Sequence, residues 1–153
     1  MRTQRGFTLV ELAVVTAIIV TLLGFITISL ARSQQTVSLT SAEEVLLVDL
    51  KQQQLKSMIG DTEGRTTTDP YGIHFDSSRY VLFHGMYSSS DTSNSVINLD
   101  SNMQFNNPNF NVTFSKLSGT TSATIIELQD NTNSKLKRIH LNIFGTVIQV
   151  ESL

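Results

Sequence analysis

The residue that most needs a chemical explanation is Glu11, a carboxylate at the edge of a long apolar segment. Residues 12–31 have the sequence LAVVTAIIVTLLGFITISLA, twenty residues without a charge. A helix of that length spans about 30 Å, the thickness of the hydrocarbon core of a bilayer. A carboxylate costs on the order of 2.5–3.5 kcal/mol near the bilayer centre and less near its surface. Glu11 is therefore predicted either to have a functional partner or to reach the headgroup region and water.

The other residue types that carry catalysis or bind metals do not form a recognisable set. His74, His84 and His140 are isolated in strand-like sequence, without metal-ligand spacing. The absence of cysteine excludes disulfides and thiolate metal sites, and no serine lies in a GxSxG elbow. Glu43 and Glu44 are adjacent and cannot both face one site on a helix, so we interpret them as a solvated face. We expect no enzyme activity, no metal and no cofactor.

A local basic cluster follows a polar turn at residues 130–134. It consists of Lys135, Lys137 and Arg138, which could reach the backbone phosphates of DNA. The whole chain has 11 Lys and Arg against 13 Asp and Glu, a net charge of −2, and so offers no general attraction to nucleic acid. We favour a solvated strand edge that lysine protects from pairing with other edges, and keep DNA contact as the alternative.

Arg2 and Arg5 precede the apolar segment and predict its orientation. Basic residues close to a span stay on the cytoplasmic side, which places the rest of the chain outside the cytoplasm. A cleaved secretory signal has an apolar core of only about 7–15 residues, shorter than this one, although residues 29–31 (SLA) resemble a cleavage site. A plain N-terminal membrane anchor explains the length and the flanking charges but not Glu11.

The sequence GFTLVEL at residues 6–12 resembles the processing motif of type IV pilins and of the pseudopilins of type II secretion. In that family a membrane peptidase cuts after the glycine, methylates the new N-terminal phenylalanine and leaves a glutamate as the fifth residue. The resemblance implies cleavage between Gly6 and Phe7, N-methylation of Phe7 and retention of the apolar helix. It also implies that Glu11 pairs with the terminal amine of a neighbouring subunit in a filament, because each charge alone is costly in lipid.

The helix is predicted to continue beyond Arg32. Residues 33–58 contain no Pro or Gly, and apolar residues recur there at spacings of three and four, as in an amphipathic helix. Those apolar residues are Val37, Leu39, Ala42, Val45, Leu46, Leu50 and Leu55. Gly60 and Gly64 are expected to end the helix, with Lys56 in its last turns. This second half should carry a globular head.

From residue 71 onward the apolar pattern has a period of two, which predicts β-strands. They are expected at residues 71–75, 80–83, 95–100, 109–116, 123–129, 137–143 and 146–150, with hairpin turns at residues 76–78 and 144–145. The alternation of Ile139, Leu141 and Ile143 predicts that these three side chains are buried. The predicted fold class is α+β, a long N-terminal helix packed against an antiparallel head of about six strands.

Two parts of the head resemble the minor pseudopilins of the H and FimT type. They are DPYGIHF at residues 69–75 with RYVLF at 79–83, and IHLNIFGTV at 139–147. The resemblance implies a long helix under two small β-sheets. Major pilins commonly carry a C-terminal disulfide loop and a proline in the apolar stretch, and this chain has neither. This difference favours a minor pilin or a pseudopilin.

The predicted organisation is a leader peptide at residues 1–6, a transmembrane or filament-core helix at 7–31, an amphipathic helix at 32–60 and a β-rich head at 61–153. The predicted function is a structural subunit of a type IV pilus or a type II secretion pseudopilus. A tip-displayed binding module, such as a DNA-uptake minor pilin, is the alternative, and an anchored domain that never polymerises is the third option. The sequence leaves open which of these machines the chain serves.

The expected partners follow from the same resemblance. They are prepilin peptidase, other pilins or pseudopilins, an inner-membrane assembly platform and membrane lipid, and no nucleic acid is expected. The expected location is the inner membrane, with the head outside the cytoplasm, and then the pilus or pseudopilus.

Overall fold

A computed structural model describes residues 9–153, except for the side chains of residues 24–37. The predicted leader and cleavage positions, including Arg2, Arg5, Gly6 and Phe7, lie outside the described residues. The chain divides into two compact units, Met1–Ser38 and Leu39–Leu153. Each unit is described by itself below.

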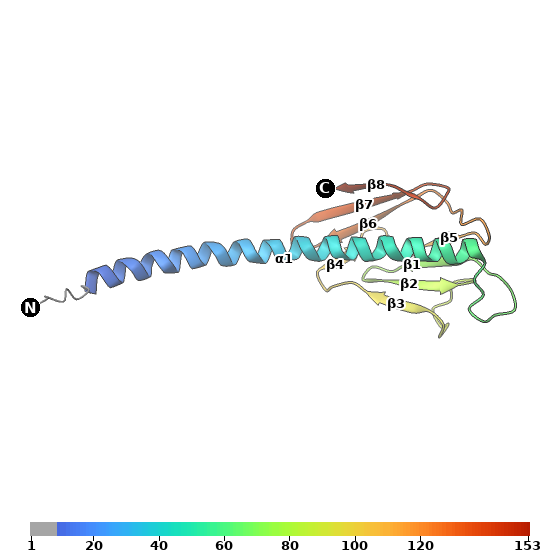
Figure 1. Ribbon diagram of the computed structural model, residues 1–153, viewed down its shortest axis with the longest axis horizontal. Helices are drawn as coiled ribbons and strands as arrows, with labels where there is room; N and C mark the ends of the chain where they lie inside the picture. The colour runs from blue at the N-terminus through green and yellow to red at the C-terminus, as the bar shows by residue number, and fades with distance from the viewer. Residues whose placement is uncertain (1–8) are drawn as a thin grey trace, which may run out of the picture. The chain divides into compact units, whose positions relative to one another are not determined.

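The described residues form one helix followed by eight strands (Figure 1). These elements are α1 (Leu9–Ile59), β1 (Tyr71–Phe75), β2 (Arg79–His84), β3 (Ser95–Asn98), β4 (Met103–Phe105), β5 (Phe110–Phe114), β6 (Thr124–Asp130), β7 (Lys135–Leu141) and β8 (Val147–Ser152). The predicted α+β class is confirmed, but the expectation of about six strands is too low. The strand that the sequence did not predict is β4, three residues long between two turns, in which Met103 and Phe105 are buried.

The strands form two four-stranded antiparallel sheets, as the resemblance implied. Their orders are β3-β2-β1-β5 and β4-β6-β7-β8. The expected hairpin between β1 and β2 is present, and the Asp76 amide donates to the Arg79 carbonyl at 2.9 Å. Each sheet therefore has two edges, and β8 forms one edge of the second sheet.

The C-terminal end of α1 has the predicted glycine stop. Gly60 has a φ of 67°, a left-handed conformation that costs glycine little. Its amide donates to the Ser57 carbonyl at 3.3 Å, and the Asp61 amide donates to the Lys56 carbonyl at 3.0 Å. These two bonds make a Schellman motif, which satisfies carbonyls that the end of a helix would otherwise leave unpaired.

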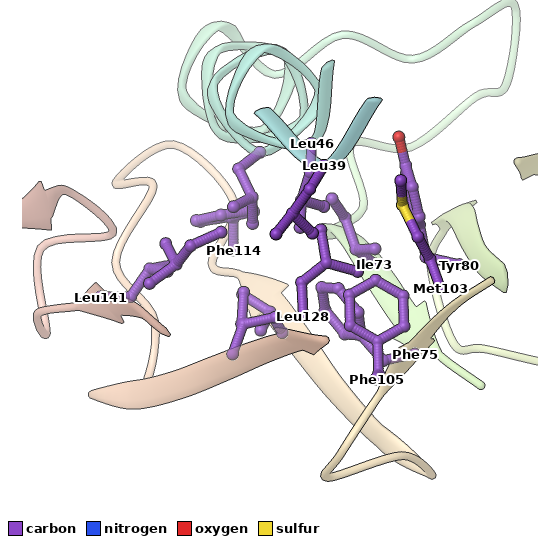
Figure 2. Close-up of a cluster of buried hydrophobic side chains, with 14 residues drawn as sticks. Leu39, Leu46, Ile73, Phe75, Tyr80, Met103, Phe105, Phe114, Leu128 and Leu141 are labelled. Carbon is purple, nitrogen blue, oxygen red and sulfur yellow. The ribbon is translucent and has the colours of Figure 1, made fainter. Parts of the chain in front are cut away.

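The core of the second unit joins the part of α1 from Leu39 onward to both sheets (Figure 2). The helix contributes Leu39, Leu46 and Leu50, each at most 3% exposed. The first sheet contributes Ile73, Phe75, Tyr80, Val112 and Phe114, and the second Met103, Phe105, Ile126, Leu128, Ile139 and Leu141. Phe75 meets Phe105 edge to face at a centroid distance of 5.0 Å, so an aromatic pair links the sheets.

On the face of the first sheet that points away from the core, glycine at position 72 allows the Phe83 ring to lie directly against the backbone of β1. A Cβ atom at Gly72 would lie 2.4 Å from the Phe83 ring and 2.7 Å from the Val112 carbonyl oxygen. The ring of Tyr87 lies 5.5 Å from that of Phe83 and stacks on His74 at 3.9 Å. Residue 72 thus has no room for a side chain, and Tyr87 covers this face of the sheet.

The prediction that Ile143 is buried is wrong. Ile139 and Leu141 are buried as expected, but Ile143 is 58% exposed. The strand ends at Leu141, because Asn142 organises the turn: its side-chain oxygen accepts the amides of Phe144 and Thr146, both at 3.0 Å. An asparagine that binds its own turn in this way stops the alternation, so the next residue points away from the core.

Candidate processing and assembly site

The first unit contains an apolar helical surface that nothing in the described residues covers. Its exposed large apolar side chains are Leu9, Val10, Leu12, Val14, Val15, Ile18, Ile19, Val20, Leu22 and Leu23. Glu11 lies among them in the first turn of α1, where a carboxylate is favoured by the helix dipole. An apolar surface of this extent is typical of a segment that is covered by lipid or by other helices.

The hydroxyl groups of the two threonines within this apolar stretch bond to the backbone of the same helix. Thr16 donates toward the carbonyls of Leu12 and Ala13, at 2.9 and 3.0 Å. Thr21 does the same toward Ala17 and Ile18, at 3.1 and 2.8 Å. Neither threonine therefore needs water or a partner side chain, which suits a water-free environment.

Two residues of the basic cluster in the head, Lys137 and Arg138, form ion pairs with carboxylates of the same chain. The Lys137 ammonium lies 2.9 Å from Glu43 on α1, and Arg138 contacts Glu127 at 2.8 Å and Glu151 at 3.4 Å. The hydrogen bond to Glu127 raises the pKa of the Arg138 guanidinium further above its usual range. Lys135 begins β7 opposite Asp130. Lys137 and Arg138 therefore hold parts of the head together and are poorly available to phosphate.

This arrangement also corrects the interpretation of Glu43 as part of a solvated face. Glu43 is 8% exposed, whereas Glu44 is exposed. The Glu43–Lys137 contact is an ion pair without an aligned hydrogen bond. It joins α1 to β7, so the two adjacent glutamates have different environments.

Residues 1–27 match the family model of the prokaryotic N-terminal methylation motif. The chain carries a prepilin-type N-terminal motif. The match includes the glycine, phenylalanine and glutamate positions described above, so it supports a type IV pilin-like chain that is processed by prepilin peptidase. No curated protein and no solved structure matches the chain.

The motif covers the first unit only in part and leaves the head outside the match. Among the residues that the structure describes, no helix is both long enough and apolar enough to cross a membrane. The predicted span at residues 12–31 extends into residues 24–37, whose side chains lie outside the described part. The membrane span stays a prediction.

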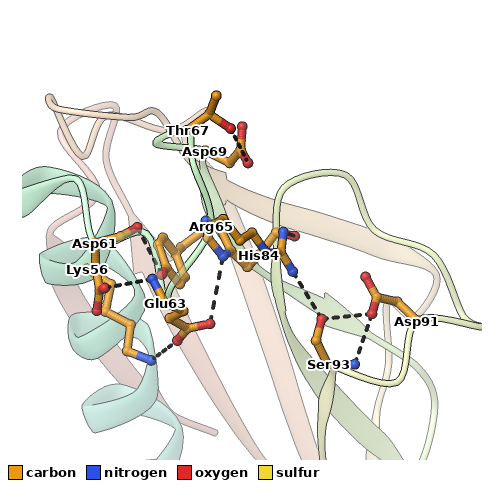
Figure 3. Close-up of polar contacts among 10 residues, drawn as sticks. Lys56, Asp61, Glu63, Arg65, Thr67, Asp69, His84, Asp91 and Ser93 are labelled. Carbon is orange, nitrogen blue, oxygen red and sulfur yellow. Dashed lines mark hydrogen bonds and ion pairs between the residues drawn. The ribbon is translucent and has the colours of Figure 1, made fainter.

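The head also contains a polar recess of about 270 Å³, lined by residues of the last turns of α1 and of β1 and β2. Glu63 is one of its lining residues and lies 2.6 Å from the Lys56 ammonium and 3.7 Å from the His84 ring (Figure 3). Burial lowers the pKa of His84, and the Arg65 charge lowers it further. Burial, followed by the charges of Glu63 and Asp61, raises the pKa of Tyr71 to about 12. His84 and Tyr71 are therefore uncharged near neutral pH, and their rings stack at 4.1 Å.

Sequence reasoning missed the polar side chains that fasten the end of α1. The Gln54 amide donates to the carbonyls of Phe144 and Gly119, at 2.7 and 3.1 Å. The Ser57 hydroxyl donates to the Phe114 carbonyl at 2.6 Å, and the Leu117 amide donates to the Ser57 carbonyl. The available signal was that residues 53, 54 and 57, which lie three, four and seven positions after the buried Leu50, continue the spacing of the buried leucines with polar side chains.

Proposed function

We propose that this chain is a minor pilin or pseudopilin, a structural subunit of a type IV pilus or a type II secretion pseudopilus. The observation that carries the proposal is the match of residues 1–27 to the N-terminal methylation motif. In this proposal prepilin peptidase cleaves between Gly6 and Phe7 and methylates Phe7. The mature chain then assembles with other pilins or pseudopilins through its N-terminal helix.

The described part of the helix supports assembly. Large apolar side chains are exposed along residues Leu9 to Leu23, and the hydroxyl groups of Thr16 and Thr21 bond to the backbone of the same helix. Such a segment is stable in lipid before assembly and against other helices afterwards. Arg2 and Arg5 would keep its start in the cytoplasm of a cell whose inner membrane it crosses.

The head supports the narrower comparison with minor pseudopilins of the H and FimT type. Two four-stranded antiparallel sheets pack with the last turns of α1, in an arrangement without cysteine. A structural role, in preference to DNA binding, agrees with the ion pairs that Lys137 and Arg138 form with carboxylates of the same chain. We place this subunit in a filament assembled on an inner-membrane platform.

The deciding experiment is mass spectrometry of the mature chain purified from membranes. The proposal expects the N-terminus at an N-methylated Phe7. A chain that starts at Arg32 would instead be a cleaved secretory protein, and one that keeps Met1 would be an unprocessed membrane anchor. Either result would overturn the proposal.

Glu11 provides a second test, because the proposal pairs it with the terminal amine of a neighbouring subunit. Glu11→Ala should leave cleavage and membrane insertion intact and reduce the incorporation of this subunit into filaments. Glu11→Asp retains the charge on a shorter side chain and serves as the matched control. Normal incorporation of Glu11→Ala would mean that the carboxylate only reaches the membrane surface.

A further inference from the structure

The polar recess at the end of α1 has buried and exposed lining residues. Its volume of about 270 Å³ corresponds to roughly nine water molecules at about 30 Å³ each. Eight of its ten lining residues are polar. We call the buried ones the floor, which consists of Gln53, Tyr71, Phe83 and His84, and the exposed ones the rim, which consists of Gln52, Glu63, Ser93 and Ser95. The recess thus leads from the surface of the head to polar groups in its interior.

The floor contains polar atoms that the fold leaves unsatisfied. In the part of the chain that the structure describes, five buried side-chain atoms have no hydrogen-bond partner, and three of them belong to the floor. These three atoms are Gln53 Oε1, His84 Nδ1 and His84 Nε2. The Glu63 carboxylate lies 3.7 Å from His84 Nδ1, too far for a hydrogen bond. Because buried polar groups are nearly always hydrogen-bonded, the floor indicates a partner from outside the chain.

The unsatisfied atoms indicate a ligand that both donates and accepts hydrogen bonds. The side-chain oxygen of Gln53 is an acceptor and needs a donor. Burial lowers the pKa of His84, so its ring is neutral near pH 7, with one nitrogen that donates and one that accepts. A hydroxyl group can bind each of these atoms, because it is donor and acceptor at once.

The charges of the recess argue against an ionic ligand. Lys56 and Glu63 are its two charged lining residues near neutral pH, and their 2.6 Å contact pairs one charge of each sign (Figure 3). An anion would meet the Glu63 carboxylate and the oxygen of Gln53, and a cation would meet the Lys56 ammonium. Since neither kind of ion finds an unpaired opposite charge among the lining residues, the recess favours a neutral ligand.

The extent of the polar lining distinguishes between neutral ligands. A single amide group could bind Gln53 or His84, but it would fill a small part of the recess and leave the polar rim to water. A sugar ring has hydroxyl groups around its circumference and apolar C–H faces, which suits a polar lining that also contains Leu82. We propose that the recess binds one ring of a neutral sugar, with its hydroxyl groups on Gln53 and His84 and its C–H groups against Leu82.

Glu63 controls access to the His84 ring. The Glu63 side chain is 40% exposed, so it can rotate away from His84 without moving the core. Its backbone φ is 46°, in the left-handed region that glycine adopts at lower cost. A non-glycine residue in this conformation beside a recess agrees with a role in binding. Rotation of the side chain gives a sugar hydroxyl a path to His84 Nδ1, and the carboxylate can then accept another hydroxyl.

Saturation-transfer difference NMR of the purified full chain tests the proposal. The chain is kept in an amine-oxide detergent, because a detergent with a sugar headgroup would compete for the recess. The probes are the methyl glycosides of glucose, galactose, mannose and N-acetylglucosamine. At least one should bind with a Kd on the order of 1 mM, as expected for a small ligand with a few hydrogen bonds. If none binds, the recess holds only water and the proposal is wrong.

Gln53→Met locates the site, because it removes the unsatisfied oxygen and keeps the length of the side chain. The affinity for the sugar should fall about tenfold, the effect of one lost buried hydrogen bond, while the unfolding temperature should change by less than about 4 °C. The matched control is Gln149→Met, the same change at an exposed position of β8, which should bind like the parent chain. Ser95→Trp places a large ring on the exposed rim and should block binding without touching the floor. Parent affinity in both Gln53→Met and Ser95→Trp would refute the site.

Acetamide and methyl phosphate are titrated in the same way, as probes for an amide and for an anion. Binding of acetamide without any of the sugars would mean that the recess accepts an amide group, and binding of methyl phosphate alone would contradict the charge argument. Either result would overturn the proposal. The assay does not depend on how the N-terminus is processed, so its outcome is independent of the proposed function.

Discussion

The neighbouring glutamines Gln53 and Gln54 provide a sensitive test of how the end of α1 is attached. Both are buried, at 3% and 4% exposure, but only the Gln54 amide has backbone partners on two loops. The Gln53 side-chain oxygen has no hydrogen-bond partner in the described structure. We predict that Gln54→Met destabilises the head and that Gln53→Met does not.

The magnitude follows from the two carbonyls that Gln54 satisfies. The Gly119 carbonyl is buried, and leaving it unpaired costs about 1–3 kcal/mol. The Phe144 carbonyl is partly buried and can accept water, so its loss costs about 0.5–1.5 kcal/mol. Together Gln54→Met should lower the free energy of unfolding by about 2–4 kcal/mol. Gln53→Met removes an unpaired oxygen and should change it by less than about 1 kcal/mol.

Thermal unfolding of the full chain in detergent, followed by near-ultraviolet circular dichroism of the buried tyrosines, measures the difference. For a unit of this size about 4 °C corresponds to 1 kcal/mol, so Gln54→Met should unfold about 8–16 °C earlier than the parent chain. Methionine has a similar length and helix propensity at both positions, so propensity cancels in the comparison. Equal losses of stability in the two variants would refute the reasoning.

Three further predictions concern the head. Gly72→Ala should lower the free energy of unfolding by about 1–3 kcal/mol in denaturant unfolding, because the added methyl group would overlap the Phe83 ring. At Gly64 an added methyl group would have no atom within 4 Å, so Gly64→Ala should lose only the cost of its backbone strain. Equal losses in the two variants would contradict steric crowding at residue 72. Because burial lowers the pKa of His84, the contribution of its neutral ring to stability is complete above about pH 6.5 and falls as the pH drops below that value. His84→Phe should therefore reduce the loss of unfolding free energy between about pH 6.5 and 5. If the dependence of stability on pH is the same in the variant, His84 is not its cause. Duplex DNA should not bind the chain at physiological salt in a gel-shift assay, because Lys137 and Arg138 are paired with carboxylates. Submicromolar binding that is abolished when Lys135, Lys137 and Arg138 are all changed to alanine would reverse that conclusion.

The strands with clear alternation could be predicted from the sequence because half of each strand faces the core. Residues 71–75 give β1 at the predicted bounds, and Gly60 ends α1 as expected. The strand β4 could not be predicted with the same ease, since three residues give a single alternation between two turns. Ile143 has the period of its strand but belongs to a turn that the Asn142 side chain sets.

The pairing of charges depended on contacts that sequence spacing does not contain. Glu43 and Lys137 are 94 positions apart, the difference between their residue numbers, and they meet only because β7 packs beside α1. Considered alone, Glu43 suggested a solvated face, and Lys137 suggested a solvated strand edge with DNA contact as the alternative. Mutual neutralisation is the cheaper arrangement once both are partly withdrawn from water, since an unpaired buried charge costs several kcal/mol.

The second half of α1 illustrates why apolar spacing alone gave an incomplete account of this helix. Val45 and Leu46 are consecutive and equally apolar, yet one is 51% exposed and the other 1%. Both belong to series with spacings of three and four, one toward the core and one on the opposite side. The core-facing series changes from leucine to glutamine and serine near the end of the helix, while the exposed series remains apolar at Val48, Leu55 and Ile59. A helix that only carried the head would have the reverse pattern, apolar inside and polar outside. The two sides of the helix are nevertheless linked, because the exposed Lys51 donates to the side-chain oxygen of the buried Gln54 at 3.1 Å; a change at Lys51 therefore also affects the group that fastens the head.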